Sequence, residues 1–427
     1  MDQTQAEFYG SLLDSESFQA LQASVDRPLR QALRFNTLMV DPSAAAQQLS
    51  ELYDWQFQPV PFCGAGFWVE PESENSSGSS LAKTVEFKMG RYYLQDAASM
   101  LPVELFAPSD EPLLTLDMAA APGGKTTHLI CHQKDKGLVI ANDSSASRIP
   151  QLRRNLRHWG CANYAVTQML GEQWGSRFPN TFDRVLLDAP CSGESLRQAA
   201  RRKSRPISSK ERERLQARQI RLLESGLAAL KPGGELIYST CTLHPDENEA
   251  VLDAVLKHWN GQVELAEPNL KLKAPGLVGV GTVEFNPTVS RAYRLWPHLY
   301  DTSGFFAALL VKTGSSADVE QVKIKSQQLN GYMPCNDSTR QELVAWYQYQ
   351  YHLDLHQFLE EQELTLWCKG NHVVALPDRY LELFGTTKTI NLGMNIAERK
   401  GERWIPSHEL VVRFGDRMHG PTLELEL

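Results

Sequence analysis

Between residues 113 and 312 the chain alternates short apolar runs, rich in β-branched residues, with longer stretches of helical periodicity. This alternation is typical of βαβ units, in which helices cover both faces of a parallel sheet. The apolar runs predict four strands in chain order, at residues 113–117, 137–143, 164–167 and 183–188. We therefore expect an α/β fold with a doubly wound sheet at its centre.

The second half of this region predicts the elements that complete the sheet. A helix over residues 210–230 ends at Lys231-Pro232-Gly233-Gly234, because proline and glycine stop a helix. A strand follows at 235–239, and a further helix covers 247–259. The last apolar runs are joined by a short polar stretch and predict an antiparallel pair, at 293–296 and 305–312.

The flanking regions predict one domain on each side. Residues 1–95 mix a helical start with strand-like pieces and contain a serine-rich loop at 72–80 that we expect to be mobile. Polar residues dominate 314–338, and a helical segment and short strand-like runs such as 372–376 follow. The predicted division is an N-terminal α+β domain (1–95), a central domain (96–313), a linker (314–338) and a C-terminal domain (339–427).

Composition narrows the class of protein. With 427 residues, of which 42% are hydrophobic and 22% charged, the chain buries a sizeable core. The net charge of −8 argues against a protein that coats nucleic acid indiscriminately. The polar start and the shortness of the longest apolar run, at 305–311, predict a cytoplasmic protein without a membrane segment. Seven scattered cysteines without a CxxC pair predict neither a disulfide framework nor a metal site.

A glycine-rich turn follows the first predicted strand at Ala119-Ala120-Ala121-Pro122-Gly123-Gly124-Lys125. Such a turn lets backbone N–H groups approach a ligand at the positive end of a helix. A phosphate-binding P-loop is disfavoured, since that motif needs glycine at Ala119 and since Pro122 has no N–H. Asp143 ends the second strand, where doubly wound folds hold a ribose diol. Turn and acid together fit an adenosyl cofactor, and a plain βα turn with a surface aspartate is the alternative.

Two cysteines follow neighbouring strands, Cys191 after the strand that ends at Asp188, and Cys241 after the strand at 235–239. The carboxyl ends of parallel strands open on one crevice, so these three side chains should converge beside the cofactor. A single cysteine there is more often a small buried apolar residue, but a pair beside a carboxylate favours chemistry. A thiolate that adds to carbon 6 of a pyrimidine makes carbon 5 nucleophilic enough to accept a methyl group.

At these positions the chain resembles the Nol/Nop/Sun family of S-adenosylmethionine-dependent RNA cytosine-5 methyltransferases. The likeness covers about residues 25–312 and rests on the glycine turn, both cysteine motifs, and the segments at 33–38, 92–100, 294–298 and 304–306. It implies a Rossmann-like catalytic domain in which Cys241 is the nucleophile. It further implies that Cys191 assists breakdown of the covalent adduct, that Asp188 faces the cytosine and the cofactor, and that Ala119 to Lys125 and Asp143 hold S-adenosylmethionine.

Segments at 61–68 and 401–404 resemble the branch of that family that methylates a cytosine of 16S ribosomal RNA in the small subunit and ends in a PUA-like RNA-binding module. We expect ribosomal RNA as partner, a monomer, and a reduced or truncated PUA-like module, since the chain stops early at Leu427. Ser195 stands where the family has glycine. The usual acidic contact to adenosine after the third strand is missing or moved to Glu172.

Three further features leave alternatives open. His352 and His356 have the spacing of metal ligands on a helix but lack a third ligand. Aromatic residues at 346–351 favour core packing over base stacking. The segment from Arg197 to Arg221 holds ten basic residues against two acidic ones and is expected to grip RNA phosphates. A transfer-RNA methyltransferase of the same family and a catalytically silent ribosome-assembly factor remain as alternative functions.

Overall fold

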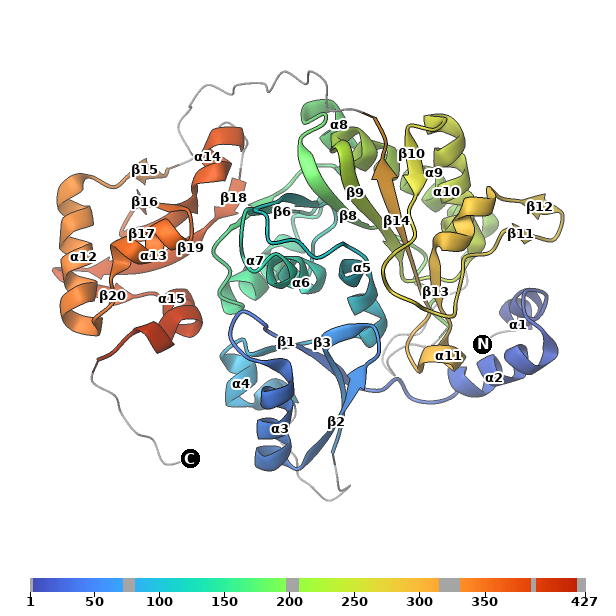
Figure 1. Cartoon of the computed structure of the whole chain (residues 1–427), viewed down its shortest axis with the longest axis horizontal. Coiled ribbons are helices and arrows are strands. Elements are labelled where there is room, and N and C mark those ends of the chain that lie inside the picture. The colour runs from blue at the N-terminus through green and yellow to red at the C-terminus, as the bar shows by residue number, and fades with distance from the viewer. Residues whose placement is uncertain (1–2, 72–80, 197–206, 315–330, 385–388, 421–427) are drawn as a thin grey trace.

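A computed structural model of the chain describes residues 3–71, 81–196, 207–314, 331–384 and 389–420 (Figure 1). Its centre is a sheet of nine strands within these residues. The strands are β5 (Leu114–Asp117), β6 (Leu138–Asn142), β7 (Tyr164–Thr167), β8 (Phe182–Asp188), β9 (Leu230–Thr240), β10 (Val263–Leu265), β13 (Tyr293–Leu295), β14 (Phe305–Lys312) and β18 (Thr389–Leu392). They run in the order β10-β14-β9-β8-β5-β6-β7-β18, with β13 also paired to β14. The pairings among β5–β9 are parallel, and those of β10, β13, β14 and β18 are antiparallel.

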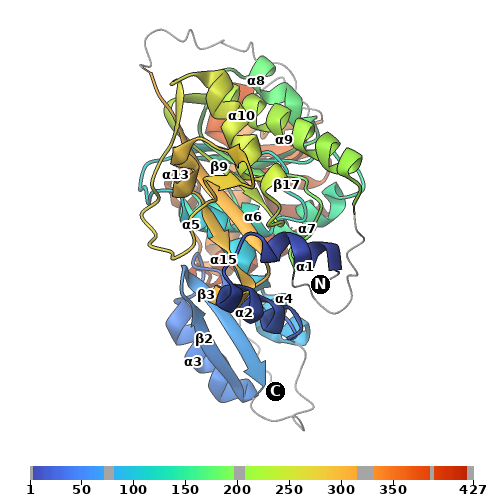
Figure 2. The ribbon, with the colours of Figure 1, turned by 90° about the vertical axis from the view of Figure 1, so that its right-hand side faces the viewer.

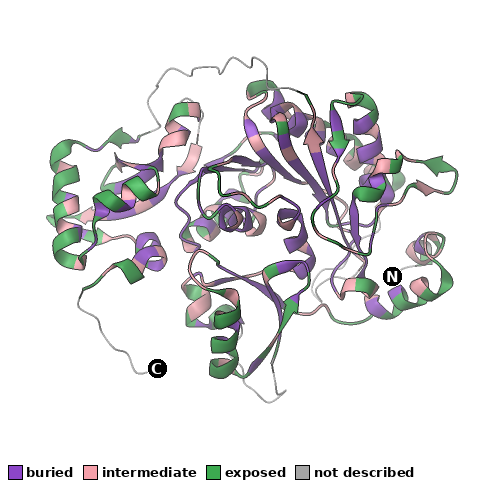
Figure 3. Ribbon diagram, in the orientation of Figure 1, coloured by how far each residue is buried: buried purple, intermediate pink, exposed green. Residues whose placement is uncertain are grey.

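Helices cover both faces of this sheet (Figures 1 and 2). One face carries α5 (Leu101–Glu104), α6 (Gly124–His132) and α7 (Ile149–His158), and the other carries α8 (Trp174–Arg177), α9 (Ser209–Ala229) and α10 (Glu249–Trp259). Strand β6 shows the reason, because Leu138 and Ile140 pack into the core under α9 and α10, whereas Val139 and Ala141 pack under α6 and α7. Strands β5 to β8 are accordingly buried along almost their whole length (Figure 3), as expected for a parallel sheet covered on both faces.

The predicted strands and helices of the central region are present, with one difference at the start of β9. The sequence predicts a turn at Lys231-Pro232-Gly233-Gly234, but the strand already begins at Leu230, which pairs with Phe182 of β8. The register shifts between Phe182 and Arg184, and Gly233 has φ +79°. Glycine adopts this φ without steric cost, so the chain turns within the pairing rather than before it.

The N-terminal region contributes a four-stranded sheet of order β2-β3-β1-β4. Its elements are α1 (Gln3–Gly10), α2 (Ser15–Val25), β1 (Ala32–Phe35), α3 (Pro42–Tyr53), β2 (Trp55–Val60), β3 (Cys63–Pro71), α4 (Val85–Lys88) and β4 (Tyr92–Leu94). Helices α1 and α2 do not pack on this sheet. Tyr9 and Leu21 are buried instead against Leu243 and Trp296 of the central region, so α1 and α2 lie against the central region.

The C-terminal region forms a five-stranded sheet of order β15-β16-β17-β19-β20. Its elements are β15 (Met333–Pro334), α12 (Asp337–Tyr351), α13 (Leu355–Glu361), β16 (Leu364–Lys369), β17 (His372–Pro377), α14 (Asp378–Phe384), β19 (Met394–Lys400), β20 (Arg403–Pro406) and α15 (His408–Phe414). Strand β18, which lies between α14 and β19 in sequence, leaves this sheet and pairs with the edge strand β7. The C-terminal region is therefore joined to the catalytic sheet by backbone hydrogen bonds.

Several expectations for the flanks need correction. Most of the expected linker, and the serine-rich loop 72–80, lie outside the described residues, but β15 pairs with Trp367 and Cys368 and assigns the end of that linker to the C-terminal sheet. His352 ends α12 with φ +51°, whereas His356 lies on α13, so the two do not share a helix. Tyr347 is fully buried, in line with core packing, while its neighbour Tyr349 is exposed.

Short elements complete the described chain, namely β11 (Gly279–Val280), β12 (Val283–Glu284) and α11 (Pro297–Tyr300). None of the helices in the described ranges combines the length and apolar character needed to cross a membrane.

Candidate active site

The two cysteines that follow β8 and β9 meet at the carboxyl end of the sheet. The Sγ atoms of Cys191 and Cys241 lie 2.9 Å apart. Their strands are parallel neighbours, with Asp188 opposite Ser239 in the register, and this pairing sets both loops at the same level. Cys241 is the more exposed residue of the pair, and Cys191 is half-buried.

The two thiols differ in how strongly each holds its proton. The hydrogen bond from Cys191 lowers the pKa of Cys241, and nearby Lys125 adds to this effect against the opposing burial and the charge of Asp188. The same hydrogen bond and burial raise the pKa of Cys191 well above its usual value. The arrangement therefore favours loss of the proton from Cys241 over loss of the proton from Cys191, and a thiol that loses its proton more readily is the better nucleophile.

A buried carboxylate, Glu247, fixes the loop that carries Cys191. Its Oε2 accepts hydrogen bonds from the backbone N–H of Ser192 at 2.9 Å and from Nε2 of Gln219 at 3.0 Å, and its Oε1 lies 3.4 Å from Arg212 Nη1. The side chain of Glu247 is fully buried. No local pattern marks this residue as part of the site, because a glutamate in the acidic run 246–249 carries no sign that it points inward.

Asp188 links the cysteine pair to the glycine turn. Its Oδ1 accepts a hydrogen bond from Ser239 Oγ at 2.9 Å, and its Oδ2 forms an ion pair with Lys125 Nζ at 2.8 Å. Burial alone lowers the pKa of Lys125, but the charge of Asp188 outweighs it and the net shift is upward. Lys125 therefore stays positively charged between Asp188 and Cys241.

A cavity of about 220 Å³ opens beside this ion pair. The turn contributes Ala119, Ala120, Ala121, Pro122, Gly124 and Lys125 to its lining, and Asp188 closes one side. Gly123 caps the N-terminus of α6 with φ +110°, a conformation open to glycine. These residues thus bring backbone groups of a helix N-terminus to the wall of a cavity, as the sequence predicts for a cofactor turn.

A second acid, Asp117, is buried near Asp188, although it is not among the residues that line the cavity. Asp117 at the end of β5 is buried, and burial together with the charge of Asp188 raises its pKa to about 7 against the hydrogen bond from Thr126. Its Oδ1 has no hydrogen-bond partner among the described residues. A buried, unsatisfied carboxylate oxygen next to Asp188 suits a ligand that brings positive charge, as the sulfonium and amino groups of S-adenosylmethionine do.

Asp143 stands at the base of the turn rather than in the cavity wall. Its Oδ2 accepts a hydrogen bond from the backbone N–H of Ala121 at 3.2 Å and lies 3.3 Å from Arg148 Nη1. Its Oδ1 accepts from Ser145 N at 2.9 Å. The carboxylate therefore supports the turn. For Asp143 to contact a ribose diol as predicted, the Arg148 side chain would have to move away from Oδ2.

The end of β4 and the segment directly after it supply part of the cavity lining that sequence reasoning did not assign to the site. Tyr93, Gln95, Asp96 and Ser99 line it opposite the glycine turn. Fully buried Arg34 of β1 ties the two walls together, since it donates to Gln95 Oε1 at 3.1 Å and to Thr127 Oγ1 at 2.7 Å. The segment 92–100 contributes to the family resemblance, and this resemblance is the sequence signal that could have assigned these residues to the site.

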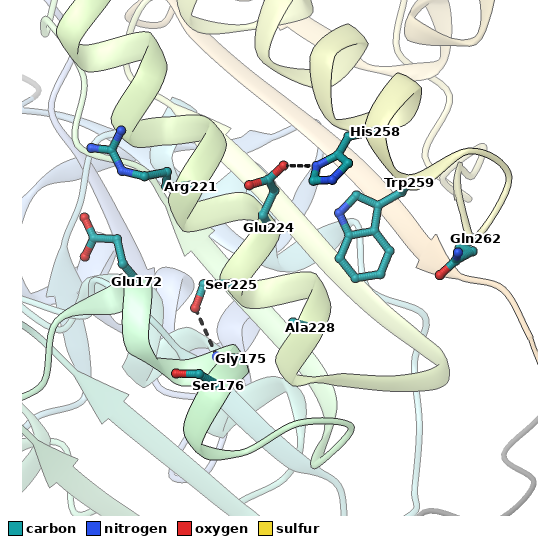
Figure 4. A pocket seen from close by; sticks show the side chains of 10 residues that line it. All are labelled: Glu172, Gly175, Ser176, Arg221, Glu224, Ser225, Ala228, His258, Trp259 and Gln262. Carbon is teal, nitrogen blue, oxygen red and sulfur yellow. Dashed lines mark hydrogen bonds and ion pairs between the residues drawn. The ribbon is translucent and has the colours of Figure 1, made fainter.

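Glu172 does not take part in this cavity. It lines a separate hollow of about 540 Å³ between α8, α9 and α10, shown in Figure 4 with Ser176, Arg221 and Trp259. Its Oε1 accepts a hydrogen bond from Arg218 at 3.3 Å. The suggestion that Glu172 replaces the missing adenosine contact is therefore wrong for this structure.

The basic segment expected to grip RNA is partly used inside the protein. Residues 197–206 lie outside the described ranges. On α9, Arg212 is paired with Glu194 at 2.8 Å and is only 14% exposed, and Arg218 is paired with Glu172. These two arginines stabilise the active-site loops and α9, so the RNA-binding prediction rests on the remaining basic residues of the segment.

One cluster of side chains able to ligate a metal occurs in the described part of the chain, formed by Cys63, Glu104 and His128. His128 Nε2 lies 3.0 Å from Glu104 Oε1 and 4.0 Å from Cys63 Sγ. Burial lowers the pKa of His128 to about 4 and raises that of Cys63. As it stands, the cluster is a hydrogen-bonded contact between β3, α5 and α6.

Comparison with known proteins agrees with this geometry. Residues 103–311 match the family model of the 16S rRNA methyltransferase RsmB/F, and residues 3–97 match that of the N-terminal domain of 16S rRNA methyltransferase RsmF. Ribosomal RNA small subunit methyltransferase F of Erwinia tasmaniensis is 34% identical over 97% of this chain and 83% of its own length. The chain belongs to the RsmB/F family of 16S rRNA methyltransferases. The resemblance to this branch is thereby confirmed.

Further relatives of this RsmB/F family member extend the agreement. Ribosomal RNA small subunit methyltransferase F of Cronobacter sakazakii is 35% identical over 91% of this chain and 78% of its own length. A methyltransferase homologue from Pyrococcus horikoshii, 33% identical, superposes with a TM-score of 0.63 over 73% of this chain and 95% of its own. NSun6 from the same organism, at 22% identity and a TM-score of 0.61 over 73% and 98% of the two chains, shares the fold. The Rossmann-like α/β prediction is therefore confirmed.

Proposed function

We propose that the protein transfers a methyl group from S-adenosylmethionine to carbon 5 of a cytosine in 16S ribosomal RNA, through a covalent adduct on Cys241. S-adenosylmethionine is the methyl donor of the family. The observation that carries the proposal is the 2.9 Å contact of two thiols whose proton affinities are shifted in opposite directions, beside the Asp188–Lys125 ion pair. The relatives that cover most of the chain are named as small-subunit ribosomal RNA methyltransferases.

The first step uses the thiolate of Cys241. Its sulfur forms a bond to carbon 6 of the cytosine. The electrons of the 5,6 double bond move toward carbon 4 and N3 of the ring, and the resulting enamine is nucleophilic at carbon 5. Asp188, held by Ser239 and Lys125, is placed to steady this charge shift at the nitrogen edge of the base. When bound, S-adenosylmethionine would supply the methyl group that bonds to carbon 5, with the electrons of the broken methyl–sulfur bond remaining on the cofactor sulfur.

The second step returns Cys241 to its starting state. A base removes the proton from carbon 5, the 5,6 double bond forms again, and the sulfur–carbon 6 bond breaks with its electrons returning to sulfur. Cys191 lies next to the departing sulfur, since the two Sγ atoms are 2.9 Å apart, and a hydrogen bond donated by its S–H would stabilise the leaving thiolate of Cys241. The loop network around Glu247 keeps Cys191 in that position.

Bisulfite sequencing tests the substrate. Ribosomal and transfer RNA are incubated with the protein and S-adenosylmethionine, and we expect new 5-methylcytosine at one position of 16S ribosomal RNA. Modification of transfer RNA instead would support the alternative substrate. Absence of 5-methylcytosine in both RNAs, with RNA binding retained, would support a silent assembly factor.

Two substitutions test the roles of the thiols. Cys241→Ala should abolish methyl transfer, whereas Cys191→Ser should accumulate a protein–RNA adduct that survives a denaturing gel. Cys368→Ala, in the C-terminal sheet, is the matched control and should leave both readouts unchanged. Full activity of Cys241→Ala would overturn the assignment.

The RNA-binding roles of the N-terminal and C-terminal regions belong to the same proposal. The C-terminal region docks on the catalytic sheet through β18 and carries a compact antiparallel sheet with four helices in its described part. Its PUA-like character, and a role for it in holding RNA, are what the family resemblance implies for residues 339–427.

A further inference from the structure

A groove of about 450 Å³ runs between α7 of the catalytic region and α15 of the C-terminal region. The two helices lie next to each other (Figure 1). From α7 it receives Arg153, Arg154, Arg157 and His158, and from α15 it receives His408 and Glu409. It shares no lining residue with the cofactor cavity or with the hollow of Figure 4.

The arginines occupy one face of α7 because of their helical spacing. Pro150, Arg153, Arg154 and Arg157 are three or four residues apart and so lie together, about 5–6 Å between neighbouring Cβ atoms. The opposite face buries Leu152 and Leu156 in the core. A helix with this pattern directs a row of guanidinium groups into the groove.

The charge of this row exceeds what the protein itself neutralises. Arg157 is paired with Glu409, which also accepts a hydrogen bond from Asn395 Nδ2 at 2.7 Å. Arg153 and Arg154 have no acidic partner within the described ranges, and Arg153 Nε is buried without a hydrogen-bond partner there. Two free positive charges in a concave site, one with an unsatisfied donor, favour an anionic ligand.

Helix α7 also connects the groove to the cofactor turn. Between the arginines, Asn155 Nδ2 donates to Pro122 O at 2.7 Å and to Tyr93 Oη at 3.1 Å. One helix therefore presents arginines outward and contacts the catalytic turn inward. A long anion lying in the groove would run along the same helix whose Asn155 contacts two residues that line the cofactor cavity.

We propose that this groove binds the phosphate backbone of the ribosomal RNA that flanks the target cytosine. Planar guanidinium groups match phosphate oxygens in pairs, and successive arginines on a helix suit successive phosphates of one strand. The inference rests on the proposed function for the identity of the RNA. It places a phosphate contact at the junction of two domains, apart from the basic segment that begins at Arg197.

The test compares two double variants of the full chain that each remove two positive charges. Arg153→Gln with Arg154→Gln removes the charges that lack acidic partners and keeps polar side chains. Lys271→Ala with Lys273→Ala removes two exposed lysines from the loop after β10 and is the matched control. Affinity for a 16S ribosomal RNA transcript is measured over a series of KCl concentrations.

The arginine variant should weaken binding about tenfold at moderate salt and reduce the slope of log Kd against log salt by about two, whereas the lysine control should match the wild type. At saturating RNA its kcat should be unchanged and its KM for RNA raised, with S-adenosylmethionine affinity preserved. An unchanged slope for the arginine variant, or an equal effect of the lysine control, would overturn the proposal that the groove binds RNA phosphates. Lost RNA binding by the arginine variant, combined with a wild type that methylates no RNA, would overturn the catalytic proposal and leave the groove standing.

Discussion

At the scale of single residues, the site depends on a difference in pKa between two thiols that are chemically identical. Cys191 and Cys241 both follow parallel strands, and the sequence alone predicts that they converge. Which of them loses its proton more readily depends first on the hydrogen bond between them and then on burial and the charges of Asp188 and Lys125, and none of these can be read from spacing. The roles that the family resemblance implies agree with the direction of both pKa shifts.

This difference in pKa can be measured by alkylation. In Cys191→Ala, Cys241 loses the hydrogen bond that contributes most to its lowered pKa, so its pKa should rise. The rate of iodoacetamide labelling at Cys241, followed by peptide mass spectrometry across pH, should therefore reach half-maximum at higher pH than in the wild type. Cys368→Ala should leave the profile in place. Identical profiles for wild type and Cys191→Ala would remove Cys191 from this role.

The buried cluster at His128 predicts a pH dependence of stability. Because burial lowers the folded pKa of His128 to about 4 from 6.5, the unfolded state binds more protons as the pH falls below 6.5. The folded protein should thus lose stability between pH 6.5 and 4. Between pH 7 and pH 5, the free energy of unfolding measured with urea should fall by about 2 kcal/mol more in the wild type than in His128→Gln, whose side chain does not titrate. Parallel losses in both proteins would exclude this origin.

At the scale of elements, the sequence predicts what local periodicity determines. The strands β5, β6, β7 and β8 and the helices α9 and α10 lie within a few residues of their expected positions. Pairings between distant segments were not predictable in the same way. The residues of β18 form only a short run, and their partner β7 lies more than 200 residues earlier in the chain, so no local pattern signals the contact.

The turn between β18 and β19 allows a test of how the C-terminal region is joined to the central sheet through the pairing of β18 with β7. Gly393 has φ +64°, and a Cβ there would lie 2.0 Å from Ala375 O, whereas Gly401 has φ +62° with open space around its Cβ position. Both alanine substitutions carry the cost of a left-handed residue, about 1 kcal/mol, and Gly393→Ala adds a clash with backbone. Gly393→Ala should therefore lower the melting temperature clearly more than Gly401→Ala. Equal losses would mean that the turn relaxes freely.

At the scale of the whole molecule, elements of the N-terminal and C-terminal regions pack against or pair with the central region. Helices α1 and α2 pack beside the loop after Cys241, where Phe8 stacks on His244 at 4.7 Å between ring centres. The end of β4 and the segment directly after it line part of the cofactor cavity, and β18 extends the catalytic sheet. The domain division predicted from sequence describes the order of the chain but not these exchanges.

Removal of the C-terminal region should therefore damage the catalytic region. A chain that ends at residue 314 exposes the edge of β7, which β18 otherwise covers, and unpaired strand edges promote association between molecules. Light scattering of this truncated protein should show aggregation at concentrations at which the full chain is monodisperse. A monodisperse fragment that keeps S-adenosylmethionine affinity would show that β18 is dispensable.

The position of β18 also has a consequence for the protein during its synthesis. The strand is formed by residues 389–392, so the ribosome makes more than 200 residues after β7 before β7 can receive its last neighbour. Until then the growing polypeptide carries an open strand edge, the kind of surface on which folding chains aggregate or recruit chaperones. Slow translation upstream of residue 389 should lengthen that exposure, whereas fast completion of the chain shortens it.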